Sequence, residues 1–147
     1  MYENLPEKAL SIIADVLKAK KSEITHIEIL KQGMTNRSFM FTCRNKKYII
    51  RIPGEGTGFL INRQQELDVY ETIKDKGLCD NPIYINPHNG YKITEFLPQV
   101  KTCNASNLQN VKLCMEKLRT LHNMKLQVKH TFDIFKQIDF YESLWAG

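Results

Sequence analysis

An arginine set between two isoleucines is the first feature of this 147-residue sequence that could do chemistry. Arg51 lies between Ile50 and Ile52, so its charge needs either a charged partner or an anionic ligand. Glu66 lies in the next segment with helical spacing, and a helix carboxylate that holds a strand cation against phosphate oxygens is how kinases orient a nucleotide. The alternative is that Arg51 extends to water and that Glu66 lies on a solvated helix face.

A polar loop with one glycine precedes this arginine. The segment 31–39 contains Gly33, Met34, Thr35 and Asn36. A turn with a small residue and exposed N–H groups can close over phosphate oxygens. A single glycine in a polar loop is also typical of an ordinary hairpin turn, so the loop alone does not decide between the two interpretations.

The spacing of apolar residues predicts the elements that must position these side chains. Leu10, Ile13 and Leu17 recur at helical spacing, whereas Phe39 and Phe41 alternate as in a strand. The predicted helices cover residues 6–20, 59–76, 104–123 (with Asn104 or Ser106 as its cap) and 130–147. The predicted strands cover residues 25–29, 39–43, 48–52, 82–85 and 91–96. This order predicts an α+β chain with a protein-kinase-like small lobe, namely a five-stranded antiparallel sheet with an inserted helix, followed by the first helices of a large lobe. Many other α+β domains share such an order.

The composition narrows the class of protein. The net charge is +5, from 21 basic and 16 acidic residues, but the basic residues are scattered, so we expect no nucleic-acid partner. The four cysteines form no CxxC pair, which argues against a zinc site or a disulfide framework. No apolar run approaches the roughly 18 residues of a membrane span, and the N-terminus does not resemble a signal peptide. We therefore expect a cytoplasmic protein without a membrane partner.

Several stretches of the chain resemble the choline kinases, particularly the bacterial ones, within the aminoglycoside-phosphotransferase and protein-kinase-like fold. Three of them are GMTNRSF at 33–39, YIIRIPGEGT at 48–57 and INRQQE at 61–66. ITEFL at 93–97 resembles the hinge strand of that family, and LRTLH at 118–122 resembles its first large-lobe helix. The resemblance runs from about residue 25 to the end of the chain.

The resemblance implies a role for each matching residue. The loop from Gly33 to Asn36, including Met34 and Thr35, would cover the phosphates of ATP. Arg51 would replace the usual strand-three lysine, and Glu66 would hold it, since a guanidinium fork fits both a carboxylate and a phosphate. The hinge residues Glu95, Phe96 and Leu97 would receive the adenine edge through backbone groups. Apolar walls around the adenine would come from Ile29, Ile50 and Phe96.

The catalytic loop of this family has no match in the chain. The family carries a catalytic aspartate in an H-x-D-xxxx-N loop and a later metal-binding aspartate. None of the six aspartates in this sequence has a histidine two residues before it or an asparagine five residues after it. We therefore predict no catalytic residue and no metal ligand in this chain, with the magnesium ligands in a C-terminal half. The chain alone would not phosphorylate choline.

The domain and partner predictions follow from the family resemblance. Residues 1–97 would form the ATP-binding small lobe with its N-terminal helix, and residues 98–147 the hinge and the first large-lobe helices. The partners would be a nucleotide and, in the full-length enzyme, choline or a similar amino alcohol. A dimer could form through exposed apolar faces of the last two helices. Two alternatives stay open: a non-catalytic interaction or regulatory domain, and a part of a related kinase that uses ethanolamine or an aminoglycoside-like acceptor.

Overall fold

An antiparallel sheet forms the centre of the computed structural model, which describes residues 5–30 and 35–145. Within those residues the strands lie in the order β1-β2-β3-β5-β4, and every neighbouring pair is antiparallel. The strands are β1 (Ile24–Ile29), β2 (Asn36–Cys43), β3 (Lys46–Pro53), β4 (Pro82–Ile85) and β5 (Lys92–Glu95). The predicted five-stranded antiparallel sheet of an α+β fold is confirmed.

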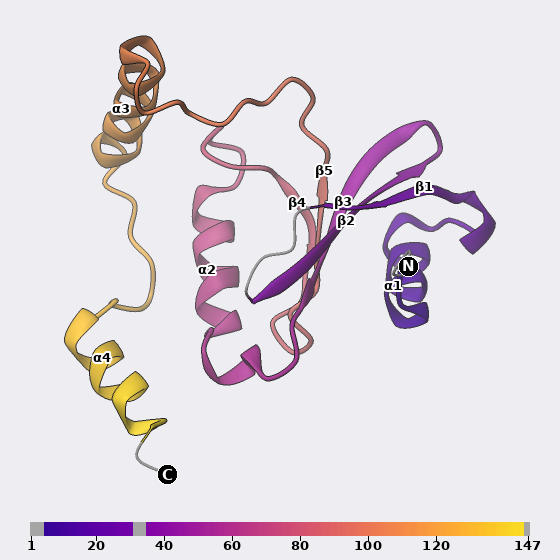
Figure 1. Cartoon of the computed structure of the whole chain (residues 1–147), viewed down its shortest axis with the longest axis horizontal. Coiled ribbons are helices and arrows are strands. Elements are labelled where there is room, and N and C mark those ends of the chain that lie inside the picture. Colours follow the sequence, from indigo (N-terminus) through magenta and orange to yellow (C-terminus); the bar gives the residue numbers. More distant parts are fainter. Residues whose placement is uncertain (1–4, 31–34, 146–147) are drawn as a thin grey trace.

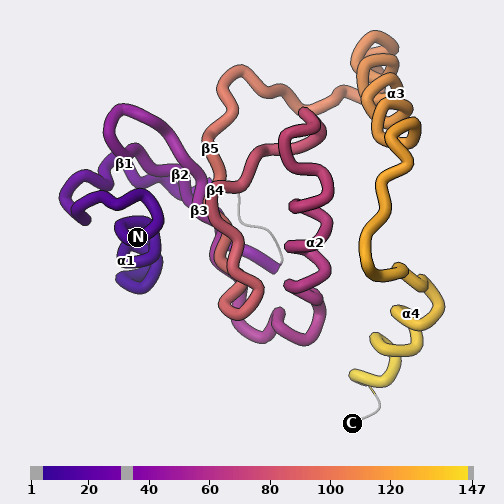
Figure 2. The backbone as a smooth tube through the Cα atoms, turned by 180° about the vertical axis from the view of Figure 1, so that it is seen from behind, coloured from indigo at the N-terminus to yellow at the C-terminus, as the bar shows by residue number. Residues whose placement is uncertain are grey.

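Helices lie on both sides of this sheet. They are α1 (Glu7–Leu17), α2 (Arg63–Ile73), α3 (Leu108–Asn123) and α4 (Ile134–Ser143), with short 3-10 turns at Lys21–Glu23 and Thr57–Phe59. Figure 1 shows α1 on one side of the sheet and α2 on the other, and the view from behind in Figure 2 agrees. In both views α3 and α4 lie beyond α2, away from the sheet. No helix in the described part of the chain is long and apolar enough to cross a membrane.

The hydrophobic core lies between α1 and the sheet. Ala9 and Ile13 of α1 are fully buried in one cluster with side chains from β2, β3 and β5. Side chains alternate between the two faces of a strand, so each strand contributes every second residue to this core. From β2 these are Phe39, Phe41 and Cys43; from β3, Tyr48, Ile50 and Ile52; from β5, Ile93.

The face of the sheet toward α2 has a different character. It carries Ile49 and Arg51 from β3, which pair in the strand register with Thr94 and Lys92 of β5. In α2 no residue is fully buried. This helix is therefore not held to the sheet by a closed apolar core of the kind that holds α1.

The first strand differs from its predicted pattern. The alternation of Ile27 and Ile29 predicts a regular strand over 25–29. In the structure the register of β1 against β2 shifts between Thr25 and Glu28, and His26 between them has φ 49°. An inserted residue of this kind is a β-bulge, which redirects the side chains that follow it. As a result, Ile27 and Ile29 are 38% and 40% exposed.

Two predicted helices are shorter in the structure. The first ends at Leu17 rather than at residue 20, because Lys18 adopts a left-handed conformation with φ 50°. The second spans 63–73 rather than 59–76. It begins after Asn62, whose side-chain oxygen accepts a hydrogen bond of 3.1 Å from the N–H of Gln65, as a helix N-cap does. It ends at Ile73, before the glycine at 77, because Lys74 leaves the helical conformation with ψ 140°.

The caps of the last two helices are also clear in the structure. The third helix begins after Asn107, whose side chain accepts from the N–H of Asn110, so the predicted caps Asn104 and Ser106 are wrong. The fourth begins after Asp133, whose carboxylate accepts from two backbone N–H groups, and it is shorter than the predicted 130–147. Composition predicts that a helix begins near such residues but not which of several polar residues caps it.

Candidate functional site

The predicted cation and carboxylate pair is present between the sheet and α2. The two terminal guanidinium nitrogens of Arg51 on β3 face the carboxylate of Glu66 on α2. Nη1 is paired to Oε1, and Nη2 donates to Oε2 over 2.9 Å. The two side chains are only 15% and 18% exposed. A two-point contact of this kind fixes the plane of the guanidinium as well as its position. The interpretation of Arg51 and Glu66 as solvated surface residues is therefore wrong.

A second arginine joins this pair and ties it to the loop before β2. Arg63, in the first turn of α2, donates to Oε2 of Glu66 over 3.1 Å and to Oδ1 of Asn36 over 3.3 Å. Asn36 in turn donates to the hydroxyl of Thr35 over 3.0 Å. The structure therefore brings together Thr35, Asn36, Arg51 and Glu66, which lie far apart in the sequence. Gly33 and Met34 lie outside the described residues.

Sequence reasoning did not single out Arg63 as a site residue. The signal that could have identified it is its spacing, because residues three apart lie on the same side of a helix. A carboxylate one turn after an arginine at the start of a helix could therefore have been expected to pair with it. The link from Arg63 to Asn36 crosses between distant segments and has no such local signal.

The charges in this cluster do not cancel. Burial by itself raises the pKa of Glu66, but the hydrogen bonds from Arg51 and then from Arg63, with the attraction of their charges, outweigh it and hold the pKa below its usual range. Glu66 is therefore ionised at neutral pH, and two guanidinium groups share its single negative charge. The Nε of Arg51 is buried without a hydrogen-bond partner among the described residues. The cluster is net positive, which suits an anionic ligand.

Two glycines allow the backbone to come close to this cluster. The N–H of Gly54 donates to the carbonyl of Thr35 over 2.8 Å, and a Cβ on Gly54 would lie only 3.1 Å from that carbonyl oxygen. Gly90, with φ 70°, accepts a hydrogen bond from Arg51. A Cβ on Gly90 would lie 3.2 Å from Nε of Arg63. Both positions therefore favour glycine because a neighbour fills the space of a side chain.

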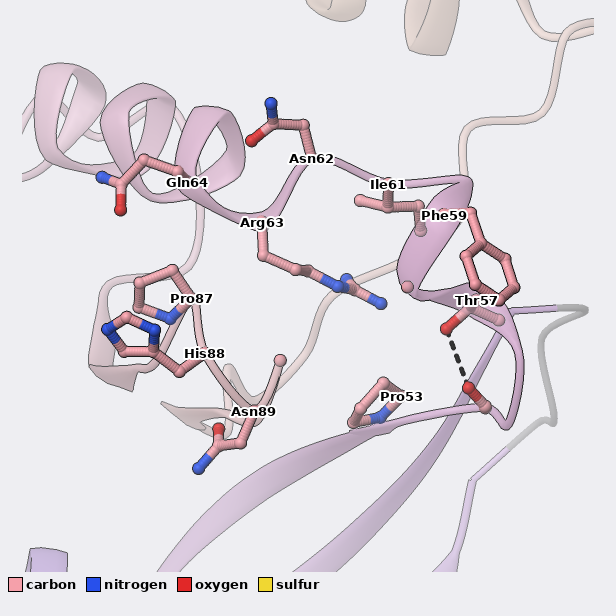
Figure 3. A pocket seen from close by; sticks show the side chains of 13 residues that line it. Pro53, Thr57, Phe59, Ile61, Asn62, Arg63, Gln64, Pro87, His88 and Asn89 are labelled. Carbon is pink, nitrogen blue, oxygen red and sulfur yellow. Dashed lines mark hydrogen bonds between the residues drawn. The ribbon is translucent and has the colours of Figure 1, made fainter. Parts of the chain in front are cut away.

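Arg63 also borders a hollow of about 650 Å³ on the outer side of the cluster. Figure 3 shows its side chain extending across this hollow between the segment Thr57–Phe59 and the turn that carries His88 and Asn89. The dashed line in Figure 3 marks the 2.8 Å hydrogen bond from Thr57 to the carbonyl of Gly54, which braces the glycine loop after β3. The hollow therefore lies beside the second arginine, and the predicted hinge residues do not line it.

A separate cavity of about 330 Å³ opens on the face of the sheet that carries Arg51. Its lining residues come from β2, β3 and β5, from the residue after β1 and from the segment before β4: Leu30, Ser38, Ile49, Arg51, Asp80, Lys92 and Thr94. Ile50 belongs to the core shared with α1, and Ile29 pairs with Phe39 of the same core, so neither predicted adenine contact lies on the face that carries Arg51. Because side chains alternate along a strand, the apolar residue on the same face as Arg51 is Ile49.

The predicted hinge residues lie away from the arginine cluster. Glu95 is paired with Tyr48, toward the opposite end of β3 from Pro53, and Phe96 and Leu97 follow it. The N–H of Phe96 donates to the carbonyl of Lys47 over 3.0 Å, and the ammonium of Lys47 lies 5.7 Å from the centre of the Phe96 ring. The structure therefore places these three residues on the exit from β5, with the Phe96 N–H already bonded.

The described residues do not fit a magnesium site. Magnesium prefers several oxygen ligands, usually with carboxylates among them. In residues 5–30 and 35–145 no group of three or more His, Cys, Asp or Glu side chains could hold a metal ion. Of the acidic side chains near the cavity, Glu66 is bound by two arginines and Asp80 by Lys92.

A five-stranded sheet, an inserted helix and a strand cation held by a helix carboxylate together define a protein-kinase-like small lobe. A model of the choline/ethanolamine kinase family matches residues 27–145 of this sequence. The chain belongs to that family.

Comparison with individual relatives agrees with this assignment. Protein LicA of Haemophilus influenzae is 28% identical over 116 residues, which cover 76% of this chain and 34% of LicA. The crystal structure of choline kinase LicA from Streptococcus pneumoniae has 30% identity and a TM-score of 0.74, covering 91% of this chain and 46% of that one. A structure of LicA in complex with AMP has 30% identity and a TM-score of 0.69, covering 91% and 48%. The chain thus spans about a third to a half of the length of these relatives.

Proposed function

We propose that this chain is the ATP-binding portion of a choline-kinase-like phosphotransferase, which transfers a phosphoryl group from ATP to the hydroxyl of choline. The observation that carries the proposal is the net positive cluster of Arg51, Glu66 and Arg63 beside Thr35 and Asn36. The similarity to a LicA structure that contains AMP supports it. In this proposal residues 1–97 are the small lobe, and residues 98–147 are the hinge and the first helices of the large lobe.

Each residue of the cluster has a role in holding the phosphates. Arg51 contacts the phosphate oxygens while Glu66 fixes the orientation of its guanidinium, so that no reorganisation is needed when charge develops during transfer. Arg63 holds Glu66 from the other side and anchors Asn36. The loop containing Gly33, Met34, Thr35 and Asn36 then covers the phosphates.

The adenine lies on the same face of the sheet, between the cluster and the hinge. Ile49 and Leu30 supply apolar contact, since both line the cavity that Arg51 borders. The N–H of Phe96 is bonded to Lys47, and successive strand residues direct their backbone groups to opposite edges. The adenine edge therefore meets the carbonyl of Glu95 and the N–H of Leu97, with the Phe96 ring beside them.

Magnesium would neutralise charge on the phosphates during transfer, as in other kinases. The described residues do not form a site for it. The acceptor rests on family membership, and ethanolamine or another amino alcohol is the alternative to choline.

A stand-alone interaction domain is the competing proposal. Such a domain is expected to bury the apolar faces of its helices, because large exposed apolar patches favour association. On α3 Leu108 is 83% exposed, on α4 Phe135 is 75% exposed, and Trp145 just after α4 is 89% exposed. This exposure disfavours a self-contained monomeric domain. The dimer through these helices stays a prediction, and light scattering of the purified chain would test it.

Titration with nucleotide tests the proposal directly. We expect ATP, with and without magnesium, to raise the thermal midpoint of the 147-residue chain, and Arg51→Met to abolish the response to ATP while retaining a weak response to adenosine. Arg44→Met is the matched control, because Arg44 is an exposed arginine paired with Glu23 at the far end of β3. No response of the unmodified chain at millimolar ATP, or an equal loss in both variants, would overturn the proposal.

A further inference from the structure

A buried lysine beside Arg51 has no role in the proposed nucleotide binding. Lys92 on β5 is 9% exposed and is the direct cross-strand partner of Arg51 on β3. Directly opposed residues in an antiparallel pair point to the same face of the sheet. The side of the sheet that faces α2 therefore carries two adjacent cations, one on each of two neighbouring strands.

Lys92 contacts the same helix as Arg51, one turn further along. Its ammonium lies 2.7 Å from the hydroxyl oxygen of Tyr70 and 4.4 Å from the centre of the Tyr70 ring. Tyr70 follows Glu66 by four residues, so the two side chains project from the same face of α2. The two strand cations thus hold two successive turns of the helix.

The charge of Lys92 is already compensated. Its ammonium donates to Oδ2 of Asp80 over 3.2 Å, and Asp80 lies in the segment between α2 and β4. Asp80 compensates the charge of this buried ammonium one to one, whereas Arg51 and Arg63 share the single carboxylate of Glu66, so Lys92 is the less suitable partner for a phosphate. The local contacts of Lys92 therefore favour an action on α2 over direct contact with a ligand.

The packing of α2 makes such an action important. No residue of α2 is fully buried, whereas α1 contributes fully buried Ala9 and Ile13 to the core. A helix whose apolar side chains are only partly buried depends more strongly on its polar contacts for its position. The orientation of Glu66 toward Arg51 therefore depends on what else holds α2 against the sheet.

We propose that Lys92 is a positioning residue, which with Tyr70 and Asp80 holds α2 so that Glu66 can orient Arg51 for nucleotide binding. The nucleotide part of this proposal rests on the proposed function of the chain. The positioning part rests only on the contacts of Lys92 in this structure, and it is tested separately.

The first experiment measures the position of α2 without any nucleotide. Hydrogen exchange of the α2 amides is followed in the full chain and in the variants Lys92→Met and Tyr70→Phe. We expect Lys92→Met to speed exchange in 63–73 about tenfold, the equivalent of one charged hydrogen bond. We expect Tyr70→Phe to speed exchange in α2 by less than Lys92→Met does. In Lys92→Arg the exchange rate should return part of the way to that of the unmodified chain. The matched control is Lys46→Met, an exposed lysine on β3.

The outcome distinguishes positioning from a general loss of stability. Exchange in the core strand β2 should stay unchanged in Lys92→Met, because Phe39, Phe41 and Cys43 of this strand pack in the core on the α1 side of the sheet. Unchanged exchange in α2, or an equal increase throughout β2, would overturn the proposal. This result stands whether or not the chain binds ATP.

The second experiment asks whether Lys92 acts through Glu66. The affinity for ATP is measured in Lys92→Met, in Glu66→Gln and in the double variant. If Lys92 acts by positioning Glu66, Lys92→Met weakens binding about tenfold alone but less than about twofold in the Glu66→Gln background. The same tenfold loss in both backgrounds would mean that Lys92 contacts the ligand directly, and it would overturn the proposal. A chain that binds no ATP would instead refute the proposed function.

Discussion

The two faces of the sheet are held to their helices by different forces. On one face Ala9 and Ile13 of α1 pack into a fully buried apolar core. On the other, α2 is held by hydrogen-bonded charges, from Arg51 to Glu66 and from Lys92 to Tyr70. The hydrophobic attraction on the apolar face is non-directional and tolerates small shifts. The charged hydrogen bonds on the polar face instead fix the orientation of particular groups.

This difference separates stability from function within one small lobe. Burial of apolar surface supplies most of the favourable free energy of folding, so the α1 face carries the fold. A net positive cluster that leaves the buried Nε of Arg51 unpaired is poorly suited to stabilise a core, whereas its net charge suits an anion. Substitutions on the two faces should therefore differ in the size of their effect on stability and in its dependence on pH.

The largest effect on the free energy of unfolding is expected from a substitution on the apolar face of the sheet. Phe41 is fully buried and stacks on Tyr48, with ring centres 5.5 Å apart. Phe41→Ala should lower the free energy of unfolding by about 4 kcal/mol, measured by urea denaturation, because it opens a cavity that the core cannot close. Phe59→Ala is the control, since Phe59 is 72% exposed, and it should change the value by less than about 0.5 kcal/mol. Similar losses in both variants would contradict a core confined to this face.

A smaller and pH-dependent effect is expected from the polar face. Glu66→Gln leaves two arginines without their carboxylate and should cost about 3 kcal/mol at pH 7. The pKa of Glu66 is lowered in the folded chain, so its stabilisation is present above the ordinary value of 4.5 and is lost as the pH falls through the folded value. The difference in the free energy of unfolding between the unmodified chain and Glu66→Gln should therefore shrink below pH 4.

Urea denaturation at pH 7, 5 and 3 measures this difference. Glu23→Gln is its control, because hydrogen bonding to Arg44 lowers the pKa of Glu23 at the surface, where solvent reaches and screens the pair. We expect no measurable change of stability in the control. A Glu66→Gln effect that is equally large at pH 3 and pH 7 would show that its cause is not the ionised carboxylate.

Substitution of Gly90, whose carbonyl accepts a hydrogen bond from Arg51, should have a moderate effect on stability. Gly90 and Gly77 both have left-handed backbones, with φ 70° and 63°, so alanine is strained at either position. Only at Gly90 would the new Cβ meet neighbours, at 3.1 Å from Cγ of Pro53 and 3.2 Å from Nε of Arg63. Gly90→Ala should cost about 2 kcal/mol and Gly77→Ala about 1 kcal/mol in thermal unfolding. Equal costs would mean that contact with Arg63 adds nothing.

The smallest effect is expected at the start of α2. Asn62→Ala removes the cap that accepts from the N–H of Gln65 and should cost about 1 kcal/mol. Asn62→Asp keeps an acceptor at the same place and should leave the stability within about 0.3 kcal/mol. Circular dichroism during urea titration measures both. An equal loss in Asn62→Asp would show that the side chain acts by something other than its cap.

The sheet and the central pair could be predicted because their signals are local. The alternation in β2 and β3 and the helical spacing of α1 each depend on a few neighbouring residues. The pairing of Arg51 with Glu66 also followed, because a charge between isoleucines on a strand needs a partner and the next helix carries a suitable carboxylate.

Other features had no local signal or were misjudged from it. The expectation for Ile50 treats apolar neighbours alike, although strand alternation places Ile49, and not Ile50, on the face that carries Arg51. The bulge at His26 could not be predicted, since it follows from pairing with β2 and not from the residues of β1.

The sequence by itself determined the antiparallel sheet, the arginine that needs a partner and the family, because periodicity and motifs are properties of short segments. Only the tertiary structure decided that Arg63 joins Glu66 to Asn36 and that Lys92 lies beside Arg51 while holding Tyr70. These contacts join distant segments, and they exist only because packing of the sheet against α1 and α2 brings β2, β3, β5 and α2 to one place.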